Sequence, residues 1–258
     1  MASTAVAGGQ VLDASNPAVA RVRQLICGPE YSQGTSLLAI CASSMQTISD
    51  YSCADGWSRC WEEGVTPWDL GQPTPAVVQL AKSGTLPSGD AATVLVPGCG
   101  AGYDVVALSG PGRFVVGLDI CESAVAKAKQ WSAADGSLFA FVAADFFTWE
   151  PPELFDLIFD YTFFCAFHPS MRPAWAKRMA DLLKPNGELI TLMYLAEGQE
   201  AGPPFNTTVL DYEEVLKPLG FVITCIQDND VAVKPRQGME KIARWKRMAN
   251  PNTLNSAE

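Results

Sequence analysis

The sequence is poor in the residues that build metal centres and that bind nucleic acids. It has one histidine, His168, and its eight cysteines include no Cys-x-x-Cys pair, so we expect no zinc site and no other bound metal. Lysine and arginine total 18 against 28 acidic residues, which gives a formal net charge of −10. A nucleic-acid partner would require a basic surface, so the acidic balance argues against one.

Long apolar runs are also missing. None approaches the roughly 20 residues that a membrane-spanning helix needs, and the N-terminus lacks the basic region of a secretory signal. We therefore expect no membrane association and a cytoplasmic monomer, although the Ser- and Ala-rich first residues leave a transit peptide open. Hydrophobic residues make up 48% of 258 residues, which suffices for a core without disulfide bonds. The cysteines are expected to be reduced.

The first 52 residues differ from the rest of the chain in composition. They are rich in Ser, Ala, Gly and Gln, and we interpret residues 1–52 as an N-terminal extension that is partly disordered. Two short helices are predicted within it, Pro17–Ile26 and Leu37–Ile48. Residues 53–258 are predicted to form one domain of the α/β class.

Strand-like and helical stretches alternate in that domain. The predicted helices are Thr74–Ser83, Tyr103–Leu108, Ser123–Trp131, Arg172–Leu183 (stopped by Pro185-Asn186-Gly187) and Tyr212–Leu219. The predicted strands are Thr93–Val96, Phe114–Asp119, Leu138–Ala143, Asp156–Phe159, Glu188–Met193, Phe221–Gln227 and Ala243–Met248. This order predicts a mostly parallel seven-stranded sheet with helices on both faces. No helix separates the last two strands, which favours an antiparallel hairpin at one edge.

The most informative stretch follows the first strand. Gly98, Gly100 and Gly102 alternate there and lead into a predicted helix. Glycine has no Cβ, so a nucleotide-like ligand can lie against the bare backbone of such a turn. A tight turn that binds nothing would have the same sequence, and the motif is weak evidence by itself.

Acidic residues end the next three strands, at the edge where such sheets bind ligands. Asp119 lies about 20 positions after the first glycine, where a carboxylate accepts hydrogen bonds from ribose hydroxyls. Asp145 and Phe146 follow the third strand and would meet an adenine ring. Tyr161 follows Asp160 at the end of the fourth strand, where the reactive end of the ligand would lie. Alone, Asp119 would also fit a helix cap and Asp145 a loop, but together they favour a nucleoside ligand.

The glycine spacing separates two kinds of nucleoside ligand. A dinucleotide fingerprint reads G-x-G-x-x-G, whereas this turn reads G-x-G-x-G. Residues 182–189, Leu-Leu-Lys-Pro-Asn-Gly-Glu-Leu, resemble the corresponding turn of class I S-adenosylmethionine-dependent methyltransferases. A nicotinamide-dependent oxidoreductase is therefore the less favoured alternative.

Several further segments carry a closer resemblance, which extends from about residue 56 to 248. They closely resemble the plant halide and thiol methyltransferases, the harmless-to-ozone-layer proteins of the thiopurine methyltransferase family. The segments are Gly56-Trp57-x-x-Cys60-Trp61-Glu62-Glu63-Gly64-x-Thr66-Pro67-Trp68-Asp69-x-Gly71, Leu95–Gly100, Phe155–Tyr161, Gly202-Pro203-Pro204 and Arg244-Trp245-Lys246.

The resemblance implies a class I methyltransferase fold, which is Rossmann-like, with S-adenosylmethionine as cofactor. It implies methyl transfer to iodide, bromide, chloride, bisulfide, thiocyanate or small thiols. The cofactor-binding residues that it implies are Trp57, Trp61, Trp68, Gly98, Asp119, Asp145, Phe146 and Tyr161.

The resemblance implies that Trp57, Trp61 and Trp68 bind the methionine and sulfonium end of the cofactor, and this role is physically sensible. A sulfonium is a cation without hydrogen-bond donors, and aromatic faces attract such a cation by about 0.5–2 kcal/mol per ring. A halide or thiolate is already a nucleophile, so in-line displacement in a dry pocket requires no general base. The segment Tyr161–Phe167 is nearly all apolar, and the hydroxyls of Tyr161 and Tyr194 are candidates to position the acceptor. His168 is expected to be incidental, and Arg172 is expected to pair with a carboxylate.

Two segments depart from the resemblance. Pro29–Tyr51 looks like an insertion of about twenty residues that would disturb the lid over the cofactor. The alternative function is therefore a cofactor-binding protein with little turnover. Residues 195–200 also differ and are expected to border the acceptor, so the preferred acceptor does not follow from the resemblance.

Overall fold

The computed structural model describes residues 12–13, 15–27, 52–89, 92–132, 137–199 and 201–248. The predicted helix Leu37–Ile48 and the segment Pro29–Tyr51 lie outside these residues, and so does Glu200. The first predicted helix is confirmed as α1, Pro17–Cys27. No helix in the described ranges is long and apolar enough to span a membrane.

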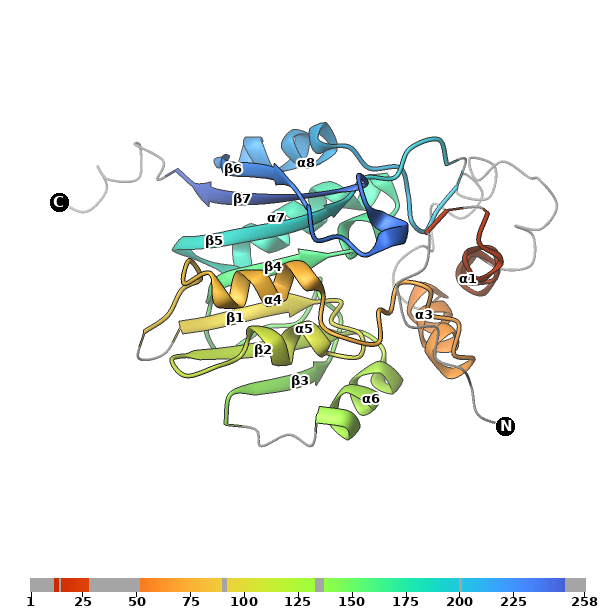
Figure 1. The fold of residues 1–258 in the computed structure, drawn as a ribbon, viewed down its shortest axis with the longest axis horizontal. Coiled ribbons are helices and arrows are strands. Elements are labelled where there is room, and N and C mark those ends of the chain that lie inside the picture. The colour runs from red at the N-terminus through yellow and green to blue at the C-terminus, as the bar shows by residue number, and fades with distance from the viewer. Residues whose placement is uncertain are drawn as a thin grey trace.

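Seven strands form one sheet in the order β3-β2-β1-β4-β5-β7-β6 (Figure 1). The first five pair in parallel, and β7 is antiparallel to both β5 and β6. The predicted mostly parallel sheet with an antiparallel edge hairpin is confirmed. The strands are β1 Ala92–Pro97, β2 Arg113–Asp119, β3 Phe139–Ala143, β4 Phe155–Tyr161, β5 Leu183–Tyr194, β6 Phe221–Asp228 and β7 Glu240–Arg247.

Helices cover both faces of the sheet, each over its own apolar core. Side chains of α4 (Pro75–Lys82), α5 (Tyr103–Leu108) and α6 (Glu122–Ser132) belong to one core. Those of α7 (Arg172–Leu182) and α8 (Val209–Leu216) belong to the other. Strand residues alternate between the two cores, as a sheet covered on both faces requires.

Three elements start three or more residues before the predicted position: β5, α8 and β7, which starts at Glu240 instead of Ala243. The start of β5 is Leu183, which pairs with Phe155, and the next pair is Leu157 with Glu188. The residues between bulge out of the ladder, and Pro185 is tolerated there because a bulged residue need not donate a backbone hydrogen bond. The start of α8 is Val209, three residues before the predicted one, because Thr208 and Asp211 form a capping box.

The helix α3, Ser52–Glu62, was not predicted, and it carries the first tryptophans of the tryptophan-rich segment. It packs against α1 through Val22, Leu25 and Cys60. Both helices lie beyond the carboxyl ends of β1 and β4 (Figure 1). A helix from the N-terminal extension therefore lies at the edge of the sheet where the sequence predicts the ligand.

Candidate cofactor site

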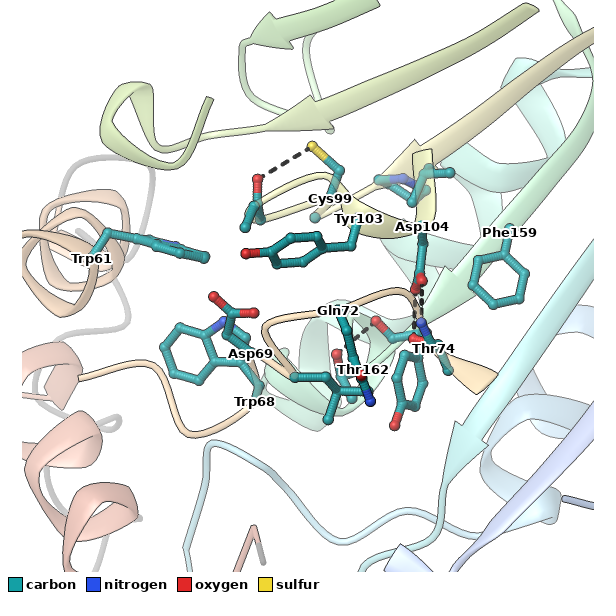
Figure 2. Close-up of a pocket in the computed structure, with 17 residues that line it drawn as sticks. Trp61, Trp68, Asp69, Gln72, Thr74, Cys99, Tyr103, Asp104, Phe159 and Thr162 are labelled. Carbon is teal, nitrogen blue, oxygen red and sulfur yellow. Dashed lines mark hydrogen bonds between the residues drawn. The ribbon is translucent and has the colours of Figure 1, made fainter. Parts of the chain in front are cut away.

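A cavity of about 70 Å³, partly open to solvent, lies at the carboxyl ends of β1 and β4. Figure 2 shows it between the tryptophan-rich segment and the first turn of α5. Its lining comes from three regions: the tryptophan-rich segment (Trp61, Trp68, Asp69, Leu70, Gln72, Thr74), β1 with the glycine turn and α5 (Val96–Ala101, Tyr103, Asp104), and the end of β4 (Phe159, Tyr161, Thr162).

The glycine turn brings bare backbone into this cavity. Gly98 has φ of 61°, a conformation that favours glycine. A Cβ at this position would lie 2.4 Å from the Phe163 ring, so even alanine does not fit without a shift of that ring. Glycine is thus required at this position by its backbone conformation and by the packing of Phe163, and the backbone of the turn forms part of the cavity lining.

Replacing Gly98 by alanine should lower the free energy of unfolding by about 1–3 kcal/mol, because it adds a left-handed residue and an overpacked contact. It should also weaken the binding of S-adenosylhomocysteine about tenfold or more. Gly220 is a matched control, since it has φ of 84° and its nearest outside atom would be 3.6 Å away. Gly220→Ala should lower stability alone, and equal losses of affinity in both variants would contradict the assignment. Calorimetric titration and urea unfolding measure the two quantities.

Two of the three predicted tryptophans line the cavity. Trp61 lies against the turn, since its ring would be 3.0 Å from a Cβ at Gly100, and Trp68 lies edge-to-face with it at 6.2 Å. Trp57 is outside the lining and instead packs edge-to-face on Trp68 at 5.2 Å. The structure therefore gives Trp57 a supporting position, behind a ring that faces the cavity.

Trp61 and Trp68 together form an aromatic wall of the cavity, and Lys127 contacts this wall at Trp61. Its ammonium lies 5.0 Å from the centre of the Trp61 ring and 3.2 Å from the Asp69 carboxylate. One face of Trp61 is thus already occupied by a cation, on a contact between α6 and α3. The sequence analysis missed Lys127, because only the folded chain brings α6 beside the tryptophan-rich segment.

The two acidic residues predicted to bind the cofactor, Asp119 and Asp145, accept hydrogen bonds from nearby backbone N–H groups. Asp119 accepts hydrogen bonds from the backbone N–H groups of Gly100 at 2.8 Å and Cys121 at 2.9 Å, so it holds the glycine turn. Burial raises its pKa. Asp145 accepts from the backbone N–H of Phe147 at 2.9 Å. Each carboxylate oxygen can accept a second hydrogen bond, so these contacts are compatible with ribose or adenine recognition. Neither residue lines the cavity.

The ring of Phe146 does not face the cavity. It is buried in the core under α7, edge-to-face with Phe163 at 5.2 Å. Phe163 in turn contacts the glycine turn at Gly98. Phe146 therefore supports the turn through Phe163, and it is not part of the cavity lining.

Tyr161 lines the cavity, but its hydroxyl is engaged in a buried polar cluster. The hydroxyl donates to the Glu240 carboxylate at 2.5 Å and accepts from the Arg236 guanidinium. Arg236 is fully buried and also donates to the backbone oxygen of Trp68 at 3.1 Å. Glu240 accepts from the Asn229 amide at 2.8 Å. Burial raises the pKa of Tyr161 well above its usual value, so the phenol stays protonated.

Tyr194, the other candidate for the acceptor, is not part of the cavity lining. It is buried in a cluster with Leu12, Val19, Cys165 and Trp68. Among the described residues, its hydroxyl and the Arg236 Nε have no hydrogen-bond partner of ordinary geometry. Burial raises the pKa of Tyr194 to about 12, while the Leu12 backbone and the Arg236 charge lower it. Tyr194 and Arg236 are thus two buried donors that have no acceptor for these atoms among the described residues, and the Arg236 charge acts on Tyr194.

The remaining polar candidates have structural partners. Arg172 forms an ion pair with Asp211 at 2.6 Å, as predicted. His168 contacts only its neighbour Ser170 among the hydrogen bonds of the described chain. In the same part of the chain, no group of three or more His, Cys, Asp or Glu residues is placed to hold a metal ion.

Comparison with known proteins identifies the family of the chain. The family Thiopurine S-methyltransferase (TPMT) matches residues 52–249. The chain belongs to this family. It is 54% identical over 215 residues to a probable thiol methyltransferase 2 of Arabidopsis thaliana, covering 80% of this chain and 94% of that protein. It is 56% identical over 195 residues to thiocyanate methyltransferase 1 of Brassica oleracea, covering 75% and 85%.

Solved structures agree on the fold of this thiopurine methyltransferase family member. One is a 1,6-didemethyltoxoflavin-N1-methyltransferase from Burkholderia thailandensis with bound S-adenosylhomocysteine (TM-score 0.59, 18% identity, 76% and 87% coverage). Another is the magnesium protoporphyrin IX methyltransferase of Synechocystis PCC 6803 with the same ligand (TM-score 0.54, 18% identity, 80% and 93% coverage). The chain is thus a class I methyltransferase, and its cofactor is S-adenosylmethionine. The aromatic wall and bare glycine turn fit that group.

Proposed function

We propose that this methyltransferase acts on small soft nucleophiles: iodide, bromide, chloride, bisulfide, thiocyanate and small thiols. The observation that carries the proposal is the pair of buried donors, Arg236 Nε and the Tyr194 hydroxyl, which have no acceptor among the described residues. Both residues contact Trp68, which lines the cavity: Arg236 donates to its backbone oxygen, and Tyr194 belongs to the apolar cluster against which Trp68 packs. The names of the plant relatives, thiocyanate and thiol methyltransferases, support the same class of acceptor.

The surroundings of these donors suit an anion that is losing its hydration shell. When bound, S-adenosylmethionine supplies a methyl group activated by a sulfonium. The Arg236 guanidinium provides a fixed positive charge, and the Tyr194 hydroxyl a neutral donor that stays protonated at neutral pH. Apolar side chains of Leu12, Cys165 and Ala196 exclude water around them. Desolvation of the anion is thereby offset by a buried charge and by hydrogen bonds.

The buried carboxylates Asp160 and Glu240 are already engaged by donors of the protein. Asp160 accepts from the Trp175 indole at 3.0 Å, and Glu240 accepts from Tyr161 and Asn229. Both are buried and already hydrogen-bonded. This supports acceptors that are nucleophilic as anions, since an alcohol or amine would require proton removal in the transition state.

Headspace gas analysis tests the proposal. The protein is incubated with S-adenosylmethionine and, separately, iodide, thiocyanate, bisulfide and thiophenol, and methylated products are quantified. We expect methyl iodide, methyl thiocyanate, methanethiol and thioanisole, each absent without protein. Calorimetric binding of S-adenosylhomocysteine with no product from any acceptor would instead support a cofactor-binding protein with little turnover. Product from a thiopurine alone would contradict the small-acceptor assignment.

We also propose that the protein works as a cytoplasmic monomer without a nucleic-acid partner. The formal net charge of −10 supports the last point, because it disfavours contact with phosphates. Size-exclusion chromatography with light scattering checks the first: a single species of twice the chain mass would contradict it.

A further inference from the structure

Asp104 lines the cavity, and the cofactor-binding residues predicted from the sequence do not include it. It lies in the first turn of α5, directly after the glycine turn. Its two carboxylate oxygens accept from one residue, Thr74: the backbone N–H donates to Oδ1 at 2.7 Å and the hydroxyl to Oδ2 at 2.7 Å (Figure 2). Thr74 is itself buried, at 4% exposed, so the carboxylate is held in one orientation.

This carboxylate has no counter-charge. No cationic side chain of the described residues forms an ion pair with Asp104, whereas the other carboxylate of the lining, Asp69, lies 3.2 Å from Lys127. Burial raises the pKa of Asp104 to about 6, and the Thr74 hydrogen bonds only partly oppose that shift. At neutral pH the group is therefore a largely ionised carboxylate facing a cavity. A charge in such a place is costly unless a partner arrives.

The cofactor carries two cationic centres that would be such a partner. The sulfonium has no N–H or O–H donor, and it suits the aromatic wall of Trp61 and Trp68. The α-ammonium has three donors, and each oxygen of Asp104 retains one acceptor position beyond its bond from Thr74. Figure 2 shows Trp61 and Asp104 on opposite sides of the cavity, with Tyr103 between them. The two cations are thus assigned to different walls by their chemistry.

We propose that Asp104 binds the α-ammonium group of S-adenosylmethionine, and that Thr74 holds the Asp104 carboxylate in the orientation that this contact requires. The amino-acid end of the cofactor is then fixed at the first turn of α5. This assignment is independent of which acceptor the enzyme methylates.

A thermodynamic cycle on the full-length chain tests the proposal. Calorimetry measures binding of S-adenosylhomocysteine and of its analogue in which hydrogen replaces the amino group. We expect the wild-type protein to prefer the amine-bearing ligand by about 10- to 100-fold, the value of one hydrogen bond to a charged group. Asp104→Asn, which keeps the shape, should lose most of that preference and bind the analogue within about threefold of wild type.

Two further variants test whether the preference for the amine depends on Asp104 specifically. Asp69→Asn removes the other cavity carboxylate and should leave the preference for the amine unchanged. Thr74→Ala, which removes only the hydroxyl bond to Asp104, should reduce the preference by a smaller factor, about threefold. Circular dichroism verifies folding, and if Asp104→Asn does not fold, the wild-type and Thr74→Ala ratios decide. The proposal is overturned if the wild-type protein shows no preference, if Asp104→Asn weakens both ligands equally, or if Asp69→Asn abolishes the preference.

Discussion

Replacing Arg236 by methionine is expected to lower the free energy of unfolding by about 3–5 kcal/mol and to abolish methyl transfer to anions. The guanidinium is fully buried between Tyr161 and the backbone of Trp68. Burial raises the pKa of the Glu240 carboxyl, and the Arg236 charge opposes that rise. Methionine fills similar volume but leaves Glu240 with an uncompensated charge. The loss of activity has a separate cause, since the anion would lose the buried positive charge of Arg236 near Tyr194.

The double variant Arg236→Met/Glu240→Gln separates these two effects. Removing the second charge should restore roughly half of the lost stability or more, because the uncompensated carboxylate is gone. Activity should stay absent. Urea unfolding and headspace analysis measure both, with binding of S-adenosylhomocysteine as the check that the cofactor site is intact. A single variant within 1 kcal/mol of wild type, or a double variant that methylates iodide at the wild-type rate, would contradict the role given to Arg236.

Replacing Asp160 by asparagine is expected to change the pH dependence of stability. Asp160 is fully buried at the end of β4, where burial raises the pKa of its carboxyl to about 7 from an ordinary value of 3.8. Between pH 4 and 7 the folded protein therefore keeps a proton that the unfolded chain releases. The contribution of Asp160 to stability falls as pH rises through this window and is constant above it.

Asparagine carries no such proton, so the difference in unfolding free energy between variant and wild type should shift by about 4 kcal/mol between pH 4 and pH 8, in favour of the variant. A change in unfolding free energy that the amide causes beside the Trp175 indole does not depend on pH, so it cancels when the two pH values are compared. Asp156 is a matched control on the same strand: burial raises its pKa, but hydrogen bonds from Lys184 and Thr93 outweigh burial and lower it. Asp156→Asn should show no change between pH 5 and 8. Parallel curves for Asp160→Asn and wild type would contradict the assignment.

Patterns of neighbouring residues were sufficient to predict the mostly parallel sheet and the glycine turn. The alternation of strands and helices predicts that β1–β5 are parallel, and the missing helix before the last strand predicts the antiparallel edge; the order of the strands was not predicted. These features depend on residues near one another in the chain. The start of β5 was missed because Lys-Pro-Asn-Gly reads as a turn, and only its pairing with β4 shows that it is a bulge.

The polar cluster around Arg236 was missed for a different reason. Its partners Tyr161 and Trp68 are 75 and 168 residues away in the chain, and Lys-Pro-Arg-Gln-Gly reads as an exposed loop. Asp104 similarly reads as an ordinary acidic residue in the first turn of a helix. Its exposure to the cavity and its lack of a counter-charge are properties of the folded chain alone, since Thr74 lies 30 residues earlier.

The location of the acceptor is the central claim, and anomalous scattering from iodide tests it most directly. Crystals of the full chain are grown with S-adenosylhomocysteine and sodium iodide, with sodium chloride crystals as the control. The account predicts an iodide peak in contact with both the Tyr194 hydroxyl and the Arg236 guanidinium, beside Trp68. Iodide peaks confined to surface lysines and arginines, with none in contact with Tyr194 or Arg236, would contradict it.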